Sequence, residues 1–277
     1  KSTECVYEKQ PEWTMESRAM LPVWINGRSI ERDAAVLIGL GIIPREMNPA
    51  YYSEPAVFDQ ALSWIGKALG LVGKSRESFA PPETILNFPN LAGIMIAAFQ
   101  WEDRVENLML PSEVEFILRD LPPVRAEARD GLAYLIHSGV FPPLPEMADE
   151  KRTATRGELI YILSKAIRSY SDPVRKGQLR RLTAKNELEV EVDGESRIIP
   201  VSPDVFLFRA QDGGVYPASR LYVLGGEDIC WVENGGEIGY LEISYPVSTA
   251  TLDRGSPFHR WLVRQSTEEL EERVNEY

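Results

Sequence analysis

Apolar residues recur at helical spacing through the first part of the chain, and the clearest example lies near its middle. Leu132, Leu135 and Ile136 fall at positions i, i+3 and i+4, which places them on one face of a helix. Gly139 follows, and then an apolar pair and two prolines beginning at Pro142. This order predicts a helix that ends at a left-handed glycine and cannot continue through the prolines.

The same pattern occurs earlier in the chain, at a constant offset of 98 residues that pairs Gly41 with Gly139. No gap is needed, and the stops Gly-Ile-Ile-Pro and Gly-Val-Phe-Pro recur with it. We therefore predict one helical pair used twice, at about residues 29–70 and 127–168. The apolar pairs that the offset aligns are Leu37 with Leu135, Ile38 with Ile136, Leu62 with Ile160, Ile65 with Leu163 and Leu69 with Ile167.

These repeats predict an all-helical domain over residues 28–170, preceded by an extended lead-in at residues 1–27. Ser29 and Ser53 are the expected caps of the two helices in the first repeat. Between the repeats, residues 91–101 predict an almost wholly apolar and therefore central helix, and Ser112 begins a shorter amphipathic one.

After residue 171 the periodicity changes to short alternating runs separated by turn residues. Leu188–Val192 alternates at period two, and Asp193-Gly194 behind it is a strong hairpin signal. Six such runs predict a small antiparallel β-barrel-like domain at residues 184–247, joined to the helices by a linker at 171–183. A return segment and a charged helix are expected at 248–277. The fold class is therefore α+β.

The composition, with 44% hydrophobic residues, 26% charged residues and a net charge of −12, excludes some classes of partner. Clustered lysine and arginine are needed to neutralise phosphates, so we expect no nucleic-acid partner and no anionic membrane surface. No apolar run approaches the roughly 18 residues of a spanning helix. The chain has two cysteines, Cys5 and Cys230, and whether they pair is left open.

Residues for catalysis or metal binding cannot be identified from the sequence, and no cofactor is predicted. The two histidines, His137 and His259, are far apart, and no cysteine or histidine cluster has ligand spacing. Glycine pairs such as Gly225-Gly226 lie between expected strands and lack the strand-to-helix setting of a phosphate loop. With 42 acidic residues, a catalytic pair of carboxylates cannot be selected.

One motif allows two interpretations. Thr155, Arg156 and Glu158 form a Thr-Arg-x-Glu sequence at a helix start, where threonine and glutamate fit a capping box and the arginine is solvated. The same motif, with the Gly-Val-Phe stop, resembles the S-layer homology module. That resemblance implies that Thr155, Arg156 and Glu158 help bind anionic cell-wall polysaccharide. The chain has Gly157 where the family has alanine, and its first repeat lacks the arginine.

A second resemblance involves the C-terminal region. Residues 220–277, and most specifically the Ser-Pro-Phe-His-Arg-Trp sequence at 256–261 followed by residues 266–270, resemble the SpoIID/LytB family of sporulation and amidase-enhancer proteins. The resemblance implies a bacterial, secreted protein that remodels peptidoglycan, located outside the cytoplasm or on the cell wall. The catalytic glutamate of that family and its Ser-Thr-Cys-Gly-Gly region are expected before Lys1, so no catalytic residue is assigned here.

The leading hypothesis is an accessory, non-catalytic region of a SpoIID/LytB-like wall-remodelling protein. Its expected partner is peptidoglycan, a wall polysaccharide or a cell-wall hydrolase. The alternatives are a protein-interaction module, in which Trp231, Tyr240 and Tyr222 form an aromatic patch or lie in the core, and a self-contained wall-lytic enzyme. The charged helix near the C-terminus, with Leu270 and Val274 as its apolar pair, is expected to fray in this chain.

Overall fold

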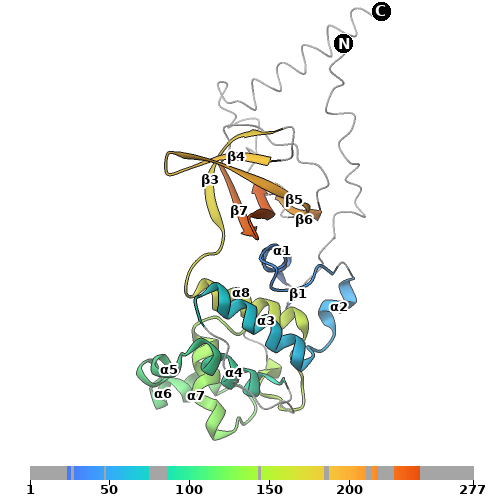
Figure 1. Ribbon diagram of the computed structural model, residues 1–277. Coiled ribbons are helices and arrows are strands. Elements are labelled where there is room, and N and C mark those ends of the chain that lie inside the picture. Colours follow the sequence, from blue (N-terminus) through green and yellow to red (C-terminus); the bar gives the residue numbers. More distant parts are fainter. Residues whose placement is uncertain are drawn as a thin grey trace, which may run out of the picture. The chain divides into compact units, whose positions relative to one another are not determined.

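The computed structural model describes two compact units, which meet in sequence between Pro173 and Val174 (Figure 1). The described residues are 24–25, 28–46, 48–74, 86–142, 145–183, 187–209, 214–217 and 228–243. The first unit is helical and the second is a β-barrel, so the α+β fold class is confirmed. Within the described residues, no helix is both long enough and apolar enough to cross a membrane.

The helical unit begins with a two-stranded hairpin and continues through a series of α-helices with one 3-10 turn. The hairpin pairs β1 with β2 in antiparallel register. The elements are β1 Trp24–Ile25, β2 Arg28–Ser29, α1 Glu31–Gly39, α2 Pro49–Ser53, α3 Phe58–Leu71, α4 Phe88–Phe99, α5 Glu102–Leu108, α6 Pro111–Leu118, α7 Ala126–His137, η3 Pro145–Ala148 and α8 Arg156–Arg168.

The two expected helical pairs are α1 with α3 and α7 with α8. Both α1 and α7 end before a glycine in the left-handed region, Gly41 at φ 70° and Gly139 at φ 71°. The Gly41 amide donates to the Ile38 carbonyl at 2.8 Å, and the Gly139 amide donates to the Ile136 carbonyl at 3.0 Å. Helices α3 and α8 also begin 98 residues apart. The offset read from the sequence is therefore reproduced in the backbone.

Several expected helix boundaries were wrong, because these helices do not begin at the serines that the sequence suggested as caps. Ser29 lies in β2, and α1 starts after Ile30 without a side-chain cap. The helix expected to start at Ser53 is two helices: α2 ends there and α3 starts after Val57. Helix α6 begins at Pro111 rather than Ser112.

The core of the helical unit gathers along the apolar faces of these helices. Helix α4 is buried along most of its length, as its uniform apolar sequence predicts. It packs against α7, while α8 packs against α1, α2 and α3. The largest fully buried side chains in this unit are Trp101, Phe88, Phe99, Phe141, Leu37, Ile42, Ile65 and Leu69.

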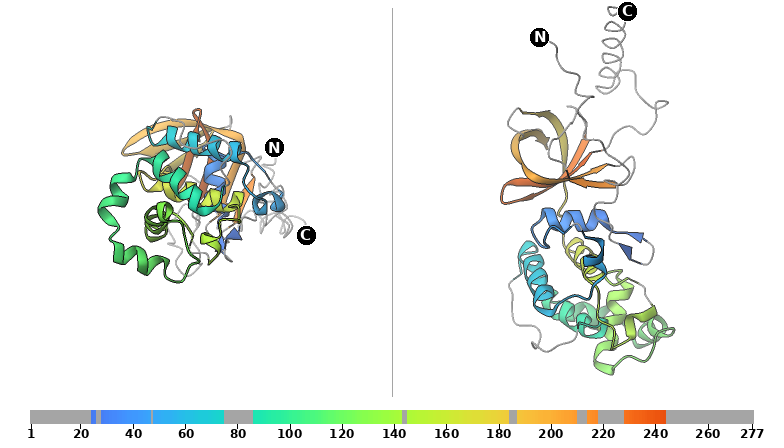
Figure 2. Two further views of the ribbon diagram at one scale, coloured as in Figure 1. Left: turned by 90° about the horizontal axis from the view of Figure 1, so that it is seen from below. Right: turned by 90° about the vertical axis from the view of Figure 1, so that its right-hand side faces the viewer.

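The second unit is a five-stranded closed barrel with one added edge strand (Figure 2). Strand β3 pairs with β4, β4 with β5, β5 with β8, β8 with β7, and β7 with β3, while among the described strands β6 pairs with β5 alone. This order, with one parallel pairing between the third and fifth barrel strands, is that of an OB-type barrel. The strands are β3 Arg175–Leu182, β4 Glu187–Val192, β5 Glu195–Arg209, β6 Gly214–Pro217, β7 Asp228–Asn234 and β8 Glu237–Ile243.

Two details of the expected barrel were wrong. Most of the segment expected as a linker at 171–183 is strand β3, whose polar sequence has little apolar alternation and whose backbone pairs with both β4 and β7. The barrel is also not wholly antiparallel, because β5 and β8 run parallel. Strand β5 combines two runs that the sequence separates, and its register shifts between Val201 and Phe206.

The hairpin signals correctly located two turns. Asp193 and Gly194 both have positive φ, 51° and 86°, and they join β4 to β5. Gly235 and Gly236 likewise have positive φ between β7 and β8. Positive φ at both central residues matches the twist of the flanking strands, which explains why these dipeptides predict the turns.

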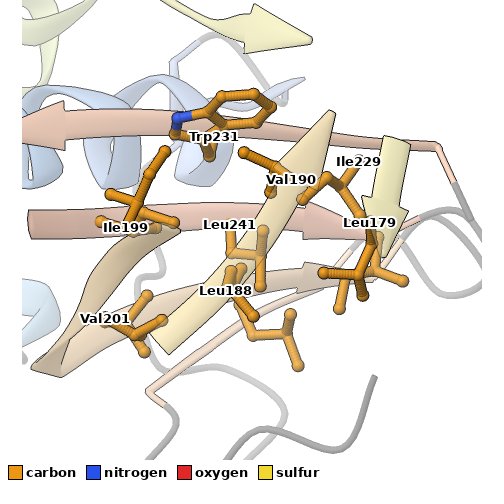
Figure 3. Packing of buried hydrophobic residues seen from close by; sticks show 12 residues of the cluster. Leu179, Leu188, Val190, Ile199, Val201, Ile229, Trp231 and Leu241 are labelled. Carbon is orange, nitrogen blue, oxygen red and sulfur yellow. The ribbon is translucent and has the colours of Figure 1, made fainter. Parts of the chain in front are cut away.

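The barrel interior is filled by aliphatic side chains and Trp231 (Figure 3). Trp231 and Tyr240 are fully buried, so they do not form the aromatic patch considered above. Gly177 on β3 allows this packing, because a Cβ atom there would lie 2.6 Å from the Glu191 carbonyl oxygen and 3.1 Å from the Trp231 ring. The cluster comprises Leu179, Leu188, Val190, Ile199, Val201, Val205, Leu207, Ile229, Trp231, Ile238, Leu241 and Ile243.

Some sequence-based expectations fall outside the described residues. They are the lead-in before residue 24, the expected strand at 221–224 with Tyr222, and the return segment and helix after residue 243. Cys5 and His259 fall outside them as well, so the question of whether Cys5 pairs with Cys230 stays open, and the fraying of the C-terminal helix stays a prediction.

Candidate functional site

The predicted site residues Thr155, Arg156 and Glu158 lie together at the start of α8. The Thr155 hydroxyl accepts from the Glu158 amide at 3.2 Å, and Glu158 Oε2 accepts from the Thr155 amide at 2.8 Å. This reciprocal pair is the capping box that the sequence predicts. It satisfies two amide groups that a helix start would otherwise leave without acceptors.

Arg156 reaches from α8 to the first repeat instead of extending into solvent. Its Nε donates to Gln60 Oε1 at 2.9 Å, and its Nη1 donates to the Tyr51 carbonyl at 3.1 Å and to Glu54 Oε2 at 2.5 Å. The guanidinium carbon lies 4.3 Å from the centre of the Tyr51 ring. With a side chain only 12% exposed, Arg156 is an internal clamp, and the expectation of a solvated arginine was wrong.

Two tyrosines near Arg156, Tyr51 and Tyr52, have raised pKa values. Burial raises the pKa of Tyr51, and the positive charge of Arg156 opposes that rise. Burial also raises the pKa of Tyr52 well above its usual range, with a further contribution from the nearby Glu46 carboxylate. The Tyr52 hydroxyl donates to the backbone carbonyl of Glu46. Both phenols are therefore neutral in the folded protein at physiological pH.

Glu158, the third predicted residue, is bound by a second arginine. Arg152 Nη2 donates to Glu158 Oε1 at 2.5 Å, and Arg152 Nη1 donates to Glu158 Oε2 at 3.3 Å. The guanidinium of Arg152 also lies over the Phe88 ring, 5.4 Å from its centre. The Glu158 side chain is 6% exposed, so its charge is buried and compensated by this bidentate pair.

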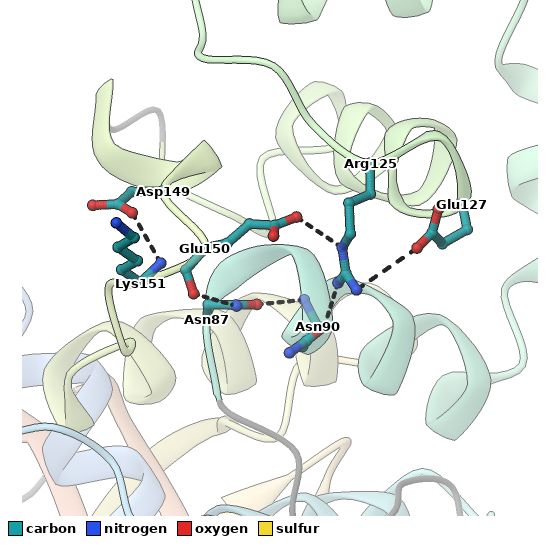
Figure 4. Close-up of polar contacts among 7 residues, drawn as sticks. All are labelled: Asn87, Asn90, Arg125, Glu127, Asp149, Glu150 and Lys151. Atoms are coloured by element: carbon teal, nitrogen blue, oxygen red, sulfur yellow. Dashed lines mark hydrogen bonds and ion pairs between the residues drawn. The ribbon is translucent and has the colours of Figure 1, made fainter.

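Helix α4 begins in the same way with different residues (Figure 4). The Asn87 side chain caps α4 by accepting from the Asn90 amide at 2.9 Å, and its Nδ2 donates to the Glu150 carbonyl at 2.7 Å. Arg125 donates through Nη2 to Asn90 Oδ1 at 2.5 Å and through Nε to Glu150 Oε1 at 2.7 Å. Glu127 lies 3.6 Å from the same guanidinium.

The starts of α3, α4 and α8 therefore share one arrangement, which we call the three helix starts. The third residue of each helix is Gln60, Asn90 or Glu158, and its side-chain oxygen accepts from an arginine of another segment. Backbone hydrogen bonds join the residues that precede the caps. The Ala56 amide donates to the Ala154 carbonyl at 2.9 Å, and the Ala154 amide donates to the Leu86 carbonyl at 2.8 Å.

The sequence located the start of α8, but it placed the start of α3 at Ser53 and missed the cap of α4. Asn-Phe-Pro-Asn at the start of α4 has no residue in common with Thr-Arg-Gly-Glu at the start of α8. It also missed the roles of Arg125 and Arg152, because both act on residues of other elements. The usable signal was Asn87 followed by Pro89, since asparagine at a cap and proline in the first turn mark a helix start.

The side chains at the three helix starts differ in how far their own contacts already engage them. The Glu158 carboxylate accepts hydrogen bonds through both oxygens, so it is not available as a general acid or base. Among the residues that the structure describes, no group of three or more histidine, cysteine, aspartate and glutamate side chains could hold a metal. The groups that can meet a ligand are the arginines, with Arg125 43% and Arg152 29% exposed.

A shallow hollow is also present between α6 and α7. Its lining includes Phe116, which is 69% exposed, and the nearby Leu108 and Leu110 are 59% and 61% exposed. Arg129 crosses from α7 to pair with Glu115 at 2.6 Å. The hollow is lined by Ser112, Glu115, Phe116, Leu118, Arg119, Leu121, Pro122, Pro123, Val124 and Arg129.

The outer face of the barrel carries balanced charge. Glutamates of β4 pair with arginines of β3, Glu191 with Arg180 and Glu189 with Arg181. Glu233 on β7, 13% exposed, accepts from Trp231 Nε1 at 2.9 Å and from Arg175 at 3.0 Å. Because these arginines are already compensated by carboxylates, the face offers little net charge to a phosphate backbone.

Comparison with known proteins adds no assignment, since no family model, curated protein or solved structure matches this chain.

Proposed function

We propose that this chain is an accessory, non-catalytic region of a SpoIID/LytB-like wall-remodelling protein, and that its helical unit binds an anionic polymer of the cell wall. In this role the chain positions a catalytic partner on peptidoglycan and does not itself break bonds. The observation that carries the proposal is the repeated helix start with its partly exposed arginines. Helix starts direct amide groups and partial positive charge outward, and both favour anionic ligands.

Arg125, Arg152 and Arg156 differ in how much of the guanidinium is available to contact a ligand. Arg156 is almost fully used by Tyr51, Glu54 and Gln60, so its contribution is to hold the first and second repeats together. Arg125 is the most exposed of the three, although Glu127 and Glu150 already lie beside it. Binding would therefore require the ligand to share or displace an exposed carboxylate, which predicts modest affinity and strong salt dependence.

The proposal is tested by sedimentation with purified sacculi. We expect the chain to sediment with intact sacculi at low salt and to be released as salt rises. Sacculi treated with hydrofluoric acid, which cleaves phosphodiester-linked polysaccharide, should retain less of the chain if that polysaccharide is the ligand. Arg125→Gln should weaken sedimentation, whereas the exposed Arg119→Gln at the edge of the hollow should not.

Two outcomes with sacculi would contradict different parts of the proposal. Absence of sedimentation under all salt conditions would contradict wall binding. Release of soluble anhydromuropeptides from sacculi by this chain alone would contradict the non-catalytic assignment and would support a self-contained lytic enzyme.

A second candidate is a protein-interaction module, and the exposed apolar residues beside the α6–α7 hollow favour it. Leu108, Leu110 and Phe116 present apolar surface from neighbouring helices, and such exposed surface is typical of protein contacts. Phe116→Ser should then abolish capture of a cell-wall hydrolase without changing sedimentation with sacculi. Loss of both activities, or of neither, would contradict this second role.

A further inference from the structure

At the opposite ends of α3, α4 and α8, the segments that follow these helices bring together an aromatic ring and two cations. We call this the Tyr170 cluster, and it consists of Lys74, Gln100, Trp101, Arg104 and Tyr170. Lys74 follows α3, Gln100 ends α4, Arg104 lies in the first turn of α5, and Tyr170 follows α8. Three segments that are far apart in sequence therefore converge on one ring.

The two cations lie beside the same aromatic ring. Lys74 Nζ is 5.3 Å and the Arg104 guanidinium carbon 5.5 Å from the centre of Tyr170, so the two charges are at most about 11 Å apart. Both positive charges therefore lie within cation–π distance of a single tyrosine ring. In the part of the chain that the structure describes, neither lies within ion-pair distance of a carboxylate.

This arrangement is unusual in a chain whose net charge is −12. Arginines elsewhere in both units are paired with carboxylates, including Arg129 with Glu115 and Arg168 with Asp33. Glu102 and Asp103 adjoin Arg104 in α5, yet neither pairs with it or with Lys74 within the described residues. A nearby acidic residue is thus present in sequence but is not used to neutralise the cluster.

The cluster also contains hydrogen-bond donors that have no acceptor. Gln100 Oε1 accepts from Lys74 Nζ at 2.8 Å, which leaves the Gln100 amide nitrogen without an acceptor among the described residues. Trp101 Nε1 is buried and lies near Tyr170 without forming a hydrogen bond of regular geometry in the described structure, and its ring stacks on Tyr170 with centres 6.1 Å apart. The guanidinium of Arg104 adds further donors.

Gln100 is held in a backbone conformation that its residue type rarely adopts, with φ 54° and ψ 54°. Most non-glycine residues avoid this left-handed region, and strain of this kind collects at functional sites. Here the conformation turns the chain from α4 into α5, so that Gln100, Trp101 and Arg104 lie close to Tyr170. The backbone turn and the convergence of donors thus occur at the same residues.

In this region cations and donors outnumber acceptors, of which Gln100 Oε1 is already engaged by Lys74, and such a region is complementary to a ligand that only accepts. We propose that the Tyr170 cluster binds an oxyanion, either a carboxylate or a phosphate group, between Lys74 and Arg104. An anion there would be attracted by both cations and would accept from the guanidinium and from the Gln100 amide. This site is independent of the three helix starts and of the proposed wall function.

The test measures binding of free ions to the full chain by calorimetry at low ionic strength. Inorganic phosphate and acetate are titrated separately, and saturable binding of either supports the proposal and identifies the preferred group. Lys74→Gln with Arg104→Gln should lower the affinity by at least about tenfold, because the anion then loses both of its charged hydrogen-bond donors. Chemical-shift changes on titration should centre on Gln100, Trp101 and Tyr170.

Arg119→Gln is the matched control, because Arg119 also lies over an aromatic ring, 5.3 Å from the centre of Phe116, but is exposed and paired with Asp120. It should leave the affinity unchanged. Arg104→Lys keeps the charge and should give an intermediate affinity even if the double variant fails to fold. The proposal is overturned if neither ion binds saturably, or if binding in either Arg104 variant equals that of the unchanged chain.

Discussion

At the scale of single residues, side chains that join distant segments explain much of the helical unit. Arg156 is the clearest case, because one guanidinium binds a carbonyl, an amide oxygen and a carboxylate that lie 96 to 105 residues earlier in the chain. The sequence correctly located the residue and its helix start, but not its partners. Local patterns describe the element that carries a side chain, whereas its contacts across the fold depend on packing that no local pattern encodes.

Arg156→Ala should lower the free energy of unfolding by about 2 kcal/mol. Charged hydrogen bonds contribute on the order of 1.5–3 kcal/mol, and the substitution also leaves the partly buried Gln60 side chain without its donor. Urea denaturation followed by circular dichroism measures the change. Arg119→Ala is the control, since its pair with Asp120 is exposed to solvent and should contribute little to stability. Equal effects in the two variants would contradict the clamp.

The raised pKa of Tyr52 predicts how stability changes at high pH. Because the folded state holds the phenol neutral, with a pKa above the unfolded value of about 10, its contribution is complete below pH 10 and is lost as pH rises above it. Tyr52→Phe removes a hydrogen bond to Glu46 and should be the less stable protein at pH 8.

Between pH 10 and 11 that difference should narrow by roughly 1 kcal/mol, since phenylalanine cannot ionise. Urea midpoints at pH 8, 10 and 11 provide the measurement. A stability difference that stays constant across this range would show that Tyr52 ionises as readily in the folded protein as in the unfolded chain.

At the scale of elements, sequence patterns succeed where one residue type is physically required. Gly41 and Gly139 have left-handed backbones that favour glycine, and both stops were predicted. Strand β3 was missed for the opposite reason. Of its residues, Leu179 belongs to the barrel core, and most of the others are charged or polar. Its place is set by backbone pairing with β4 and β7, which leaves little periodicity to detect.

Gly177 tests how closely β3 approaches its neighbours. Gly177→Ala would place a Cβ atom 2.6 Å from the Glu191 carbonyl oxygen, so backbone must shift and the protein should lose about 1–3 kcal/mol of stability. Gly93→Ala in α4 is the matched control, because no atom lies within 4 Å of its added Cβ.

In a helix interior alanine is favoured over glycine by about 0.5–1 kcal/mol, so the control should be unchanged or more stable. Thermal unfolding of both variants provides the comparison. An unaltered melting temperature in Gly177→Ala would mean that β3 can move away from β4 at no cost.

At the scale of the whole molecule, each unit has a core made from its own residues. The barrel cluster uses residues 179–243, and the large buried side chains of the helical unit lie between Leu37 and Phe141. The sequence predicted both kinds of unit from the change in periodicity near residue 171. It did not predict the strand order, because the parallel pairing of β5 with β8 joins segments separated by a long connection.

Because the core of the helical unit is made from its own residues, we expect residues 20–173 to fold when expressed alone. A dispersed amide spectrum and one cooperative thermal transition would be the expected result. The control is a chain that ends at residue 155 and lacks α8, the helix that packs against α1, α2 and α3. Removing α8 exposes the apolar faces of its neighbours and deletes Arg156, which joins the start of α8 to Gln60 at the start of α3. The truncated control should therefore lose cooperativity, and cooperative folding of that control would show that the helical core is completed without α8.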